Sequence, residues 1–137
     1  MKVFLDTSAF ISYFIKQEFH NEEVTKKYGV YRKQKASFFT SNYIICELLT
    51  WLSAKYHKSI LEKVITTLIR LENEKEINVL YIDRVIAKKS LDIITKFSEH
   101  KISFTDATTY SLYKELSLDE VFTLDNDFKK MRVNTSF

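Results

Sequence analysis

The sequence of 137 residues has no proline, a single glycine (Gly29) and a single cysteine (Cys46). Because proline and glycine are the residues that most often interrupt helices and build irregular loops, we expect a high helix content and short connections. One cysteine excludes a framework of internal disulfides and is typical of a reducing compartment. The sequence also has no internal repeat and no apolar run long enough to cross a bilayer.

The composition is that of a globular protein, with 45% hydrophobic and 28% charged residues. A chain of this length buries about two-thirds of its unfolded surface, so we predict one domain over residues 1–137. The apolar N-terminus resembles a signal peptide, but Asp6 interrupts it and no small-residue cleavage site follows. We therefore expect a soluble, cytoplasmic protein with no membrane contact. The net charge of +3 is by itself weak evidence for a nucleic-acid partner.

Short apolar strands alternate with helices along the sequence. Strands are expected at 3–5, 37–40, 77–82 and 120–124, and the alternative of a fifth, edge strand near Val133 stays open. Helices are expected from Thr7, over 21–36, from about 42, over 59–74 and 83–97, from about Thr105, and as a turn or short helix at 125–131. This alternation predicts an α/β fold with a parallel sheet between helices. In such folds the ligand site lies at the carboxyl ends of the strands.

Acidic residues stand close to these carboxyl ends. Asp6 and Asp125 directly follow the strands KVFL and VFTL, Glu47 lies in the helix after SFFT, and Asp106 lies at the start of the helix near Thr105. Each acid taken alone is more often a helix cap than a ligand. Glu47 fits such a role least, because it stands inside an apolar helical face, IICELL, where an unpaired charge is costly.

Four converging carboxylates would need a cation. Two carboxylates about 5 Å apart repel by roughly 3 kcal/mol at an effective dielectric constant near 20. Carboxylate and hydroxyl oxygens suit Mg²⁺ or Mn²⁺ rather than zinc. The three histidines, His20, His57 and His100, show no zinc-binding spacing. We therefore expect a Mg²⁺ or Mn²⁺ site at this edge of the sheet.

Four segments, KVFLDTSAF, SNYIICELLT, SFTDATTYSLYKEL and VFTLDNDF, resemble in this order the acidic motifs of the PIN-domain nucleases, the family that includes the VapC toxins. The resemblance runs from Asp6 to Phe128. It implies a three-layer α/β/α sandwich with a central parallel sheet of four to five strands, and a metal-dependent ribonuclease. The acidic quartet of the family corresponds to Asp6, Glu47, Asp106 and Asp125.

The sequence departs from the family pattern in two places. Arg132 stands where glycine is often found shortly after the DF pair. The last motif offers two acids, Asp125 and Asp127. We predict that Asp125 is the ligand, and that a turn separates it from Asp127, which would cap the short helix and reach a metal only through water.

Divalent ions held by carboxylates can activate water, neutralise a phosphoryl group and stabilise the leaving oxygen. We expect Asp6 and Asp106 to be the central ligands, with Glu47 and Asp125 completing the set. Four hydroxyl residues are predicted to orient these carboxylates, with capping or surface exposure as an equal alternative for each. They are Thr7, Ser8, Thr105 and Thr123.

Basic residues beside an acidic site are candidates for binding RNA. Lys129 and Lys130, which follow the last acid closely, are the best placed. Tyr110 is expected in the core, because it lies at helical spacing beside Ala107. The apolar segments ISYFI and ITTLIRL suit either the core or a homodimer surface.

Other functions remain open at this stage. A haloacid-dehalogenase-type phosphatase would need a second aspartate where Ser8 stands, and a receiver domain would need a lysine that VFTLD lacks. A nuclease-like module that only binds RNA or protein, and a structure-specific DNA nuclease, are the stronger alternatives. The VapC resemblance also implies an antitoxin partner.

Overall fold

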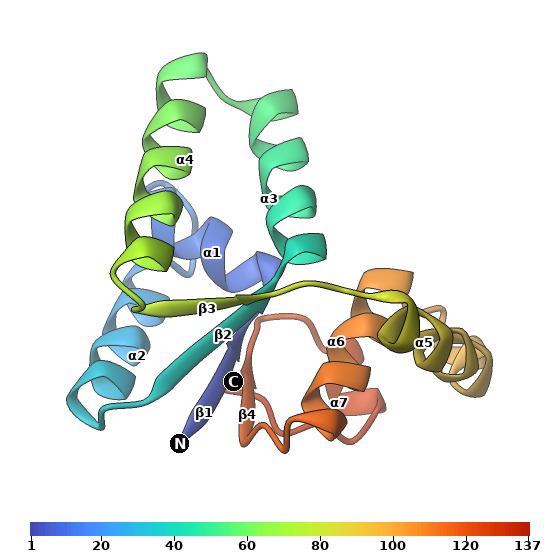
Figure 1. The fold of residues 1–137 in the computed structure, drawn as a ribbon. Helices are drawn as coiled ribbons and strands as arrows, with labels where there is room; N and C mark the ends of the chain where they lie inside the picture. Colours follow the sequence, from blue (N-terminus) through green and yellow to red (C-terminus); the bar gives the residue numbers. More distant parts are fainter.

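The computed structural model describes residues 1–137 and has a four-stranded sheet with helices on both sides (Figure 1). The strands are β1 (Lys2–Leu5), β2 (Ser37–Ser41), β3 (Ile77–Leu80) and β4 (Glu120–Phe122). Their order is β3-β2-β1-β4, and all three pairings are parallel. The predicted α/β fold with a central parallel sheet is therefore confirmed.

The helices form two groups (Figure 1). They are α1 (Thr7–Phe14), α2 (Asn21–Lys33), α3 (Asn42–Lys55), α4 (Lys58–Asn73), α5 (Arg84–Lys96), the 3₁₀ helix η1 (Ser98–His100), α6 (Phe104–Glu115) and α7 (Asp127–Lys130). Helices α1 to α4 lie on one side of the sheet and α5 to α7 on the other, and α3 and α4 form a hairpin that extends beyond the sheet (Figure 1). None of these helices is both long and apolar enough to span a membrane.

The strand order reverses at β1. After β1 the chain adds β2 and β3 on one side, and it then returns to add β4 on the other. Leu5, at the end of β1, pairs with Phe122, at the end of β4. Because these two strands are parallel neighbours, the residues that follow them emerge side by side at the switch in strand order, which is where α/β folds place their ligand sites.

Burial of β1 on both faces explains its apolar sequence. Val3 and Phe4 point to opposite faces of the sheet, yet both are completely buried. On the side of the sheet that α3 covers, Ile44, Leu48 and Leu52 recur every four residues along this helix and are also completely buried. The core therefore holds the carboxyl end of β1 rigidly against the start of α1.

Two strands are shorter than predicted, and the fifth strand is absent. β3 ends at Leu80 and β4 at Phe122, two residues early in each case. Beyond Phe122 the Leu124 amide donates to the Ser8 hydroxyl at 2.9 Å, so a side chain takes the place of a ladder bond. Near Val133 the structure has only an isolated bridge between Val121 and Thr135, so the sheet has four of the four to five strands predicted.

Several helices end in a left-handed residue that is not glycine. The residues with positive φ are Lys35, Lys75, Lys101, Ser117 and Arg132. After α4, Lys75 has a φ of 58°; its amide donates to the Glu72 carbonyl at 3.0 Å, and the Glu76 amide donates to Leu71 at 2.9 Å. This is the Schellman pattern, in which glycine is the favoured residue. A chain with almost no glycine therefore ends its helices at a small cost in strain.

Replacing Lys75 by glycine should stabilise the protein. The left-handed backbone costs a residue with a Cβ atom about 1–2 kcal/mol, and glycine avoids this strain. Part of the gain in stability is offset because glycine has more conformational freedom in the unfolded state. We expect Lys75→Gly to raise the free energy of unfolding by up to about 1 kcal/mol in urea melts. As a control, Lys63→Gly, in the exposed interior of α4, should lower it by about 1 kcal/mol. A similar loss at both positions would contradict the assignment of strain to Lys75.

Candidate metal centre

Asp6 lies directly after β1, at the N-cap position of α1, and it is 5% exposed. Its carboxylate makes no capping hydrogen bond. Instead, the Thr123 hydroxyl donates to Asp6 Oδ2 at 2.7 Å, and the Ser8 hydroxyl donates to the same oxygen at 3.0 Å. Asp6 is thus held by hydroxyl groups from both strand ends, which is not the arrangement of a helix cap.

The two other predicted hydroxyl residues have different surroundings. Thr7 is buried, and its hydroxyl has no hydrogen-bond partner. Thr105 is half-buried and lines a shallow depression on α3 together with Glu47. Neither hydroxyl contacts an acid, so the structure brings only Ser8 and Thr123 into contact with a predicted carboxylate.

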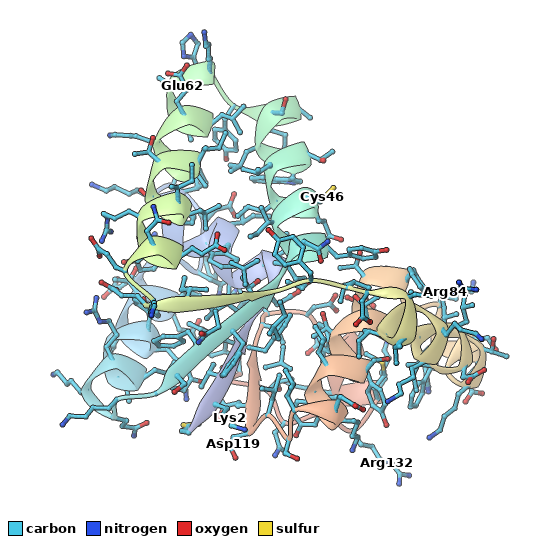
Figure 2. The ribbon with its side chains drawn as sticks, in the orientation of Figure 1. Lys2, Cys46, Glu62, Arg84, Asp119 and Arg132 are labelled. Atoms are coloured by element: carbon cyan, nitrogen blue, oxygen red, sulfur yellow. The ribbon has the colours of Figure 1, made fainter.

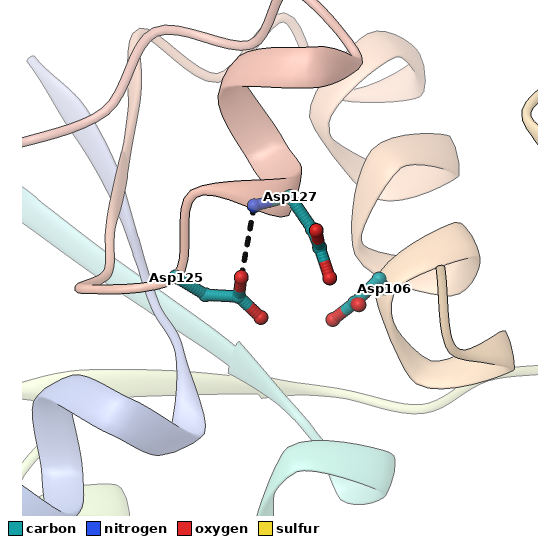
Figure 3. Close-up of side chains that lie close together, drawn as sticks. All are labelled: Asp106, Asp125 and Asp127. Atoms are coloured by element: carbon teal, nitrogen blue, oxygen red, sulfur yellow. Dashed lines mark hydrogen bonds between the residues drawn. The ribbon is translucent and has the colours of Figure 1, made fainter. Parts of the chain in front are cut away.

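Three aspartates form a carboxylate cluster: Asp106 from α6, Asp125 from the turn between β4 and α7, and Asp127 from α7 (Figure 3). One carboxylate oxygen from each of Asp106, Asp125 and Asp127 lies within 4.8 Å of the others. Asp106 is buried, whereas Asp125 and Asp127 are half-buried. The Asp127 amide donates to Asp125 Oδ1 at 2.8 Å, which closes the turn between β4 and α7 (Figure 3).

The prediction that the turn between Asp125 and Asp127 keeps their carboxylates apart was wrong. The residue at the N-cap of α7 is Asn126, and Asp127 is the first residue of the helix. Because Asp125 accepts the amide two residues later, the turn folds back and brings both carboxylates to the same side. The spacing DxD, which is typical of such turns, was the signal in the sequence that could have placed Asp127 in the cluster.

Glu47 lies outside this cluster and is exposed. The expectation that it stands in a buried apolar face was therefore wrong. The buried face of α3 contains Ile44, Leu48 and Leu52, and Glu47, one residue before Leu48, lies outside that face. Its negative charge is nevertheless close enough to contribute to the raised pKa of Asp6.

The acids shift one another's pKa. The pKa of Asp106 is raised to about 7, first by burial and then by the charges of Asp6 and Asp125, while hydrogen bonds from Ser103 act in the opposite direction. The pKa of Asp6 is also raised, because burial outweighs the two hydroxyl donors. One cation touches the cluster: Lys130 Nζ donates to Asp127 Oδ1 at 2.7 Å. Positive charge is therefore in deficit at this site.

The residues present fit a divalent cation. The cluster offers only carboxylate oxygens, the ligands preferred by Mg²⁺ and Mn²⁺. Asp106, Asp125 and Asp127 would hold the ion, and a divalent charge would offset the repulsion that raises the pKa of Asp106. Asp6, clamped by Ser8 and Thr123, would add negative charge beside them.

Asp106 also takes part in a capping box at the start of α6. Its amide donates to the Ser103 hydroxyl at 3.0 Å, and the Ser103 amide donates to Asp106 Oδ2 at 3.3 Å. The capping alternative and the ligand hypothesis therefore apply to the same side chain. They differ in the sign of the effect that neutralising the carboxylate has on stability.

Asp106→Asn should stabilise the metal-free protein, and increasingly so at higher pH. Because the folded-state pKa of Asp106 lies above its unfolded value, the wild-type protein loses stability as the pH rises from about 4 to about 7. Asparagine cannot ionise but can still accept from Ser103. In EDTA, we expect the stability difference in favour of Asp106→Asn to grow by about 1.4 kcal/mol per pH unit between pH 5 and pH 7.

Asp83→Asn is the matched control, since Asp83 Oδ1 caps α5 by accepting from the Ile86 amide at 2.9 Å and lies outside the cluster. It should change the free energy of unfolding by only about a few tenths of a kcal/mol, because asparagine and aspartate cap helices about equally well. If Asp106→Asn instead lowered the free energy of unfolding at every pH, the favourable interaction of its charge with the start of α6 would be the dominant role of this carboxylate.

The two lysines predicted to bind RNA are both exposed. Lys130 is engaged with Asp127, whose hydrogen bond and charge raise the pKa of the lysine. Lys129 forms no salt bridge. Of this pair, only Lys130 therefore contacts the cluster directly.

The structure thus combines a parallel α/β sheet with an acidic site at the switch in strand order. The family model described as the PIN domain matches residues 3–134. The chain belongs to the PIN-domain family. Comparison with curated protein sequences gives no significant match.

Solved structures share this fold over nearly their whole length. VapC20 from Mycobacterium tuberculosis, described as a sarcin-ricin loop cleaving toxin, has a TM-score of 0.81 at 17% identity, covering 96% of this chain and 95% of that one. VapBC2 from Rickettsia felis, bound to a DNA fragment from their promoter, has a TM-score of 0.75 at 14% identity, with coverage of 99% and 98%. FitAcB from Neisseria gonorrhoeae has a TM-score of 0.72 at 20% identity, with coverage of 97% and 95%.

Proposed function

We propose that this protein is an endoribonuclease that hydrolyses phosphodiester bonds of single-stranded RNA with Mg²⁺ or Mn²⁺. The observation that carries the proposal is the carboxylate cluster of Asp106, Asp125 and Asp127 beside the buried Asp6. Membership of the PIN-domain family supports a nuclease. The likeness of the fold to a toxin that cleaves the sarcin-ricin loop favours RNA as the substrate.

Each acid of the site has a separate task in this proposal. A bound divalent cation supplies an activated water and neutralises charge on the phosphoryl group. Asp106, Asp125 and Asp127 hold the cation, with the backbone amide of Asp127 fixing the orientation of Asp125. The Thr123 hydroxyl holds Asp6 in position, and Asp6 adds its negative charge beside the cluster. Glu47, the remaining member of the predicted quartet, is exposed and adds its negative charge near Asp6.

Two alternatives use the same fold without this chemistry. A non-catalytic module that binds RNA or protein would not need an intact acidic quartet, and none of the four acids is missing from this chain. A structure-specific DNA nuclease would need elements that thread or grip duplex DNA, and the connections between the helices and strands here are short. Both observations favour the ribonuclease.

The partners in this proposal are an antitoxin and a second copy of the chain. An antitoxin follows from the likeness of the fold to VapC20, which is described as a toxin. A small overlapping reading frame upstream of the gene would support a toxin–antitoxin pair. For a homodimer, the candidate surface is the apolar side of α4, where Ile69 is 54% exposed and borders a hollow that Ile65 and Leu68 also line.

Removal of divalent metal should abolish RNA cleavage. Purified protein is incubated with a mixed pool of RNA, because a selective nuclease can ignore a single arbitrary substrate. We expect cleavage with Mg²⁺ or Mn²⁺, none in excess EDTA, and recovery when metal is restored. The Asp106→Asn variant controls for contaminating ribonuclease. Cleavage that persists unchanged in EDTA would overturn the metal-dependent mechanism.

Asp125→Asn and Asp127→Asn should each lower activity at least tenfold, or about 1.4 kcal/mol in the barrier. The sequence predicted Asp125 as the ligand and Asp127 as a residue that reaches a metal only through water, which implies a much larger loss for Asp125. The structure, however, leaves one oxygen of each carboxylate available. Asp125 Oδ1 accepts the Asp127 amide, and Asp127 Oδ1 accepts from Lys130. We therefore expect the two losses to agree within tenfold in kcat/KM. Asp92→Asn, an exposed acid on α5, should leave activity unchanged.

A loss confined to Asp125 would restore the ranking predicted from the sequence and remove Asp127 from the metal site. Circular dichroism of each variant separates a lost ligand from a lost fold, because asparagine at position 125 can still accept the Asp127 amide.

A further inference from the structure

An open groove lies on the flank of α6 and α7, outside the carboxylate cluster. It has a volume of about 490 Å³ and is bounded by α6, by the end of α7 and by the turn after α5. Most of its polar residues are cationic. We use the name basic groove for six of its lining residues: Lys96, His100, Tyr110, Lys114, Lys130 and Arg132.

The basic groove begins one helical turn from the carboxylate cluster. Tyr110 comes four residues after Asp106 on α6, and Lys130 three residues after Asp127 on α7, so each helix carries an acid of the cluster and, on the same face, a residue of the groove. One turn of helix rises about 5.4 Å. Figure 3 shows both helices leading away from the cluster in the same direction. A strand with one phosphate at the cluster would therefore continue into the groove.

The positive charge of the groove is largely unpaired. Lys96, Lys114 and Arg132 form no salt bridge. A single acid, Glu99, lines the groove, and its carboxylate lies 3.7 Å from the ring of His100. Unpaired cations along a concave surface attract a polyanion and contact its phosphates.

Arg132 supplies a cation at a backbone position that favours glycine. Its φ is 57°, and its amide donates to the Lys129 carbonyl at 3.0 Å. The Val133 amide donates to Phe128 at 3.1 Å, so the end of α7 fixes the backbone on both sides. The side chain itself projects outward (Figure 2). The departure from the family pattern noted in the sequence therefore adds charge to the groove.

Aromatic rings lie among these cations. Tyr110, which was expected in the core, packs against the core and is half-buried. Lys114 Nζ lies 5.5 Å from the centroid of the Tyr110 ring, and Lys96 Nζ lies 5.2 Å from the centroid of the Phe97 ring. Phe97 and Tyr110 meet edge to face at 5.5 Å. Cations for phosphates beside rings for bases are the means by which proteins bind single-stranded RNA. An acidic polypeptide would use only the cations.

We propose that the basic groove binds the RNA strand adjacent to the phosphate that is cleaved, with Lys114 and Arg132 contacting phosphates and Tyr110 stacking against a base. The inference rests on the proposed function, because it takes RNA as the substrate. The groove positions the strand relative to the carboxylate cluster and takes no part in bond cleavage.

RNA binding without cleavage tests the proposal. The affinity of a fluorescent, random-sequence single-stranded RNA about 12 nucleotides long is measured in EDTA over a range of salt concentrations. We expect the double variant Lys114→Gln with Arg132→Gln to bind at least tenfold more weakly than the wild-type protein. Each lost phosphate contact lowers the slope of log affinity against log salt by about 0.7 for single strands, so the slope should fall by about 1.4.

A matched double variant, Lys26→Gln with Lys63→Gln, removes the same charge from exposed positions on α2 and α4 that form no salt bridge. It should bind RNA within twofold of the wild-type protein. Equal losses from both pairs would show a general charge effect and overturn the groove. Wild-type affinity in the groove variant, or no measurable binding by the wild-type protein, would also overturn it.

The same assay separates the two proposals. Binding that depends on the groove, from a protein that cleaves no RNA, would keep the groove and reject the ribonuclease. Metal-dependent cleavage by a groove variant whose affinity for RNA is unchanged would keep the ribonuclease and reject the groove. A poly-glutamate peptide that binds as tightly as RNA, and equally depends on Lys114 and Arg132, would assign the groove to an acidic protein partner and overturn the proposal.

Discussion

Burial of the Asp6 carboxylate is the constraint on which the rest of the site depends. A carboxylate that is 5% exposed must be hydrogen-bonded, and both of its hydroxyl donors contact one oxygen. Thr123 also accepts the Asp125 amide at 2.9 Å, and Ser8 accepts the Leu124 amide. One buried acid therefore joins the first strand to the last and sets where Asp125 leaves the sheet.

Opposite charges lie next to each other on this surface, and Lys130 connects them. Its ammonium group contacts Asp127 in the carboxylate cluster, and its side chain lines the basic groove. An acidic site repels a polyanion unless cations stand nearby. Lys114, two helical turns after Asp106 on α6, and Arg132, just after α7, are unpaired cations that meet this requirement.

Much of the fold could be predicted because local patterns agree with the tertiary structure. Val3 and Phe4 stand in an apolar run without alternation, as a strand buried on both faces requires. Ser41 caps α3 by accepting the Ile44 amide at 3.2 Å, and serine is one of the residues favoured before the first turn of a helix. The end of β4 could not be predicted in this way. Leu124 leaves the ladder because it meets the Ser8 hydroxyl, which lies more than a hundred residues away in the sequence.

The order and chemistry of the acids could be predicted from the sequence, and Asp6 and Asp125 could be placed together because each follows a short apolar strand and parallel strands end at one edge of a sheet. Which carboxylates meet was decided by the tertiary structure. A turn of three residues brings Asp127 to Asp106, and the side of α3 that packs on the core leaves Glu47 exposed. Helical periodicity gives the spacing of residues on a face, but only packing against the sheet determines which face is buried.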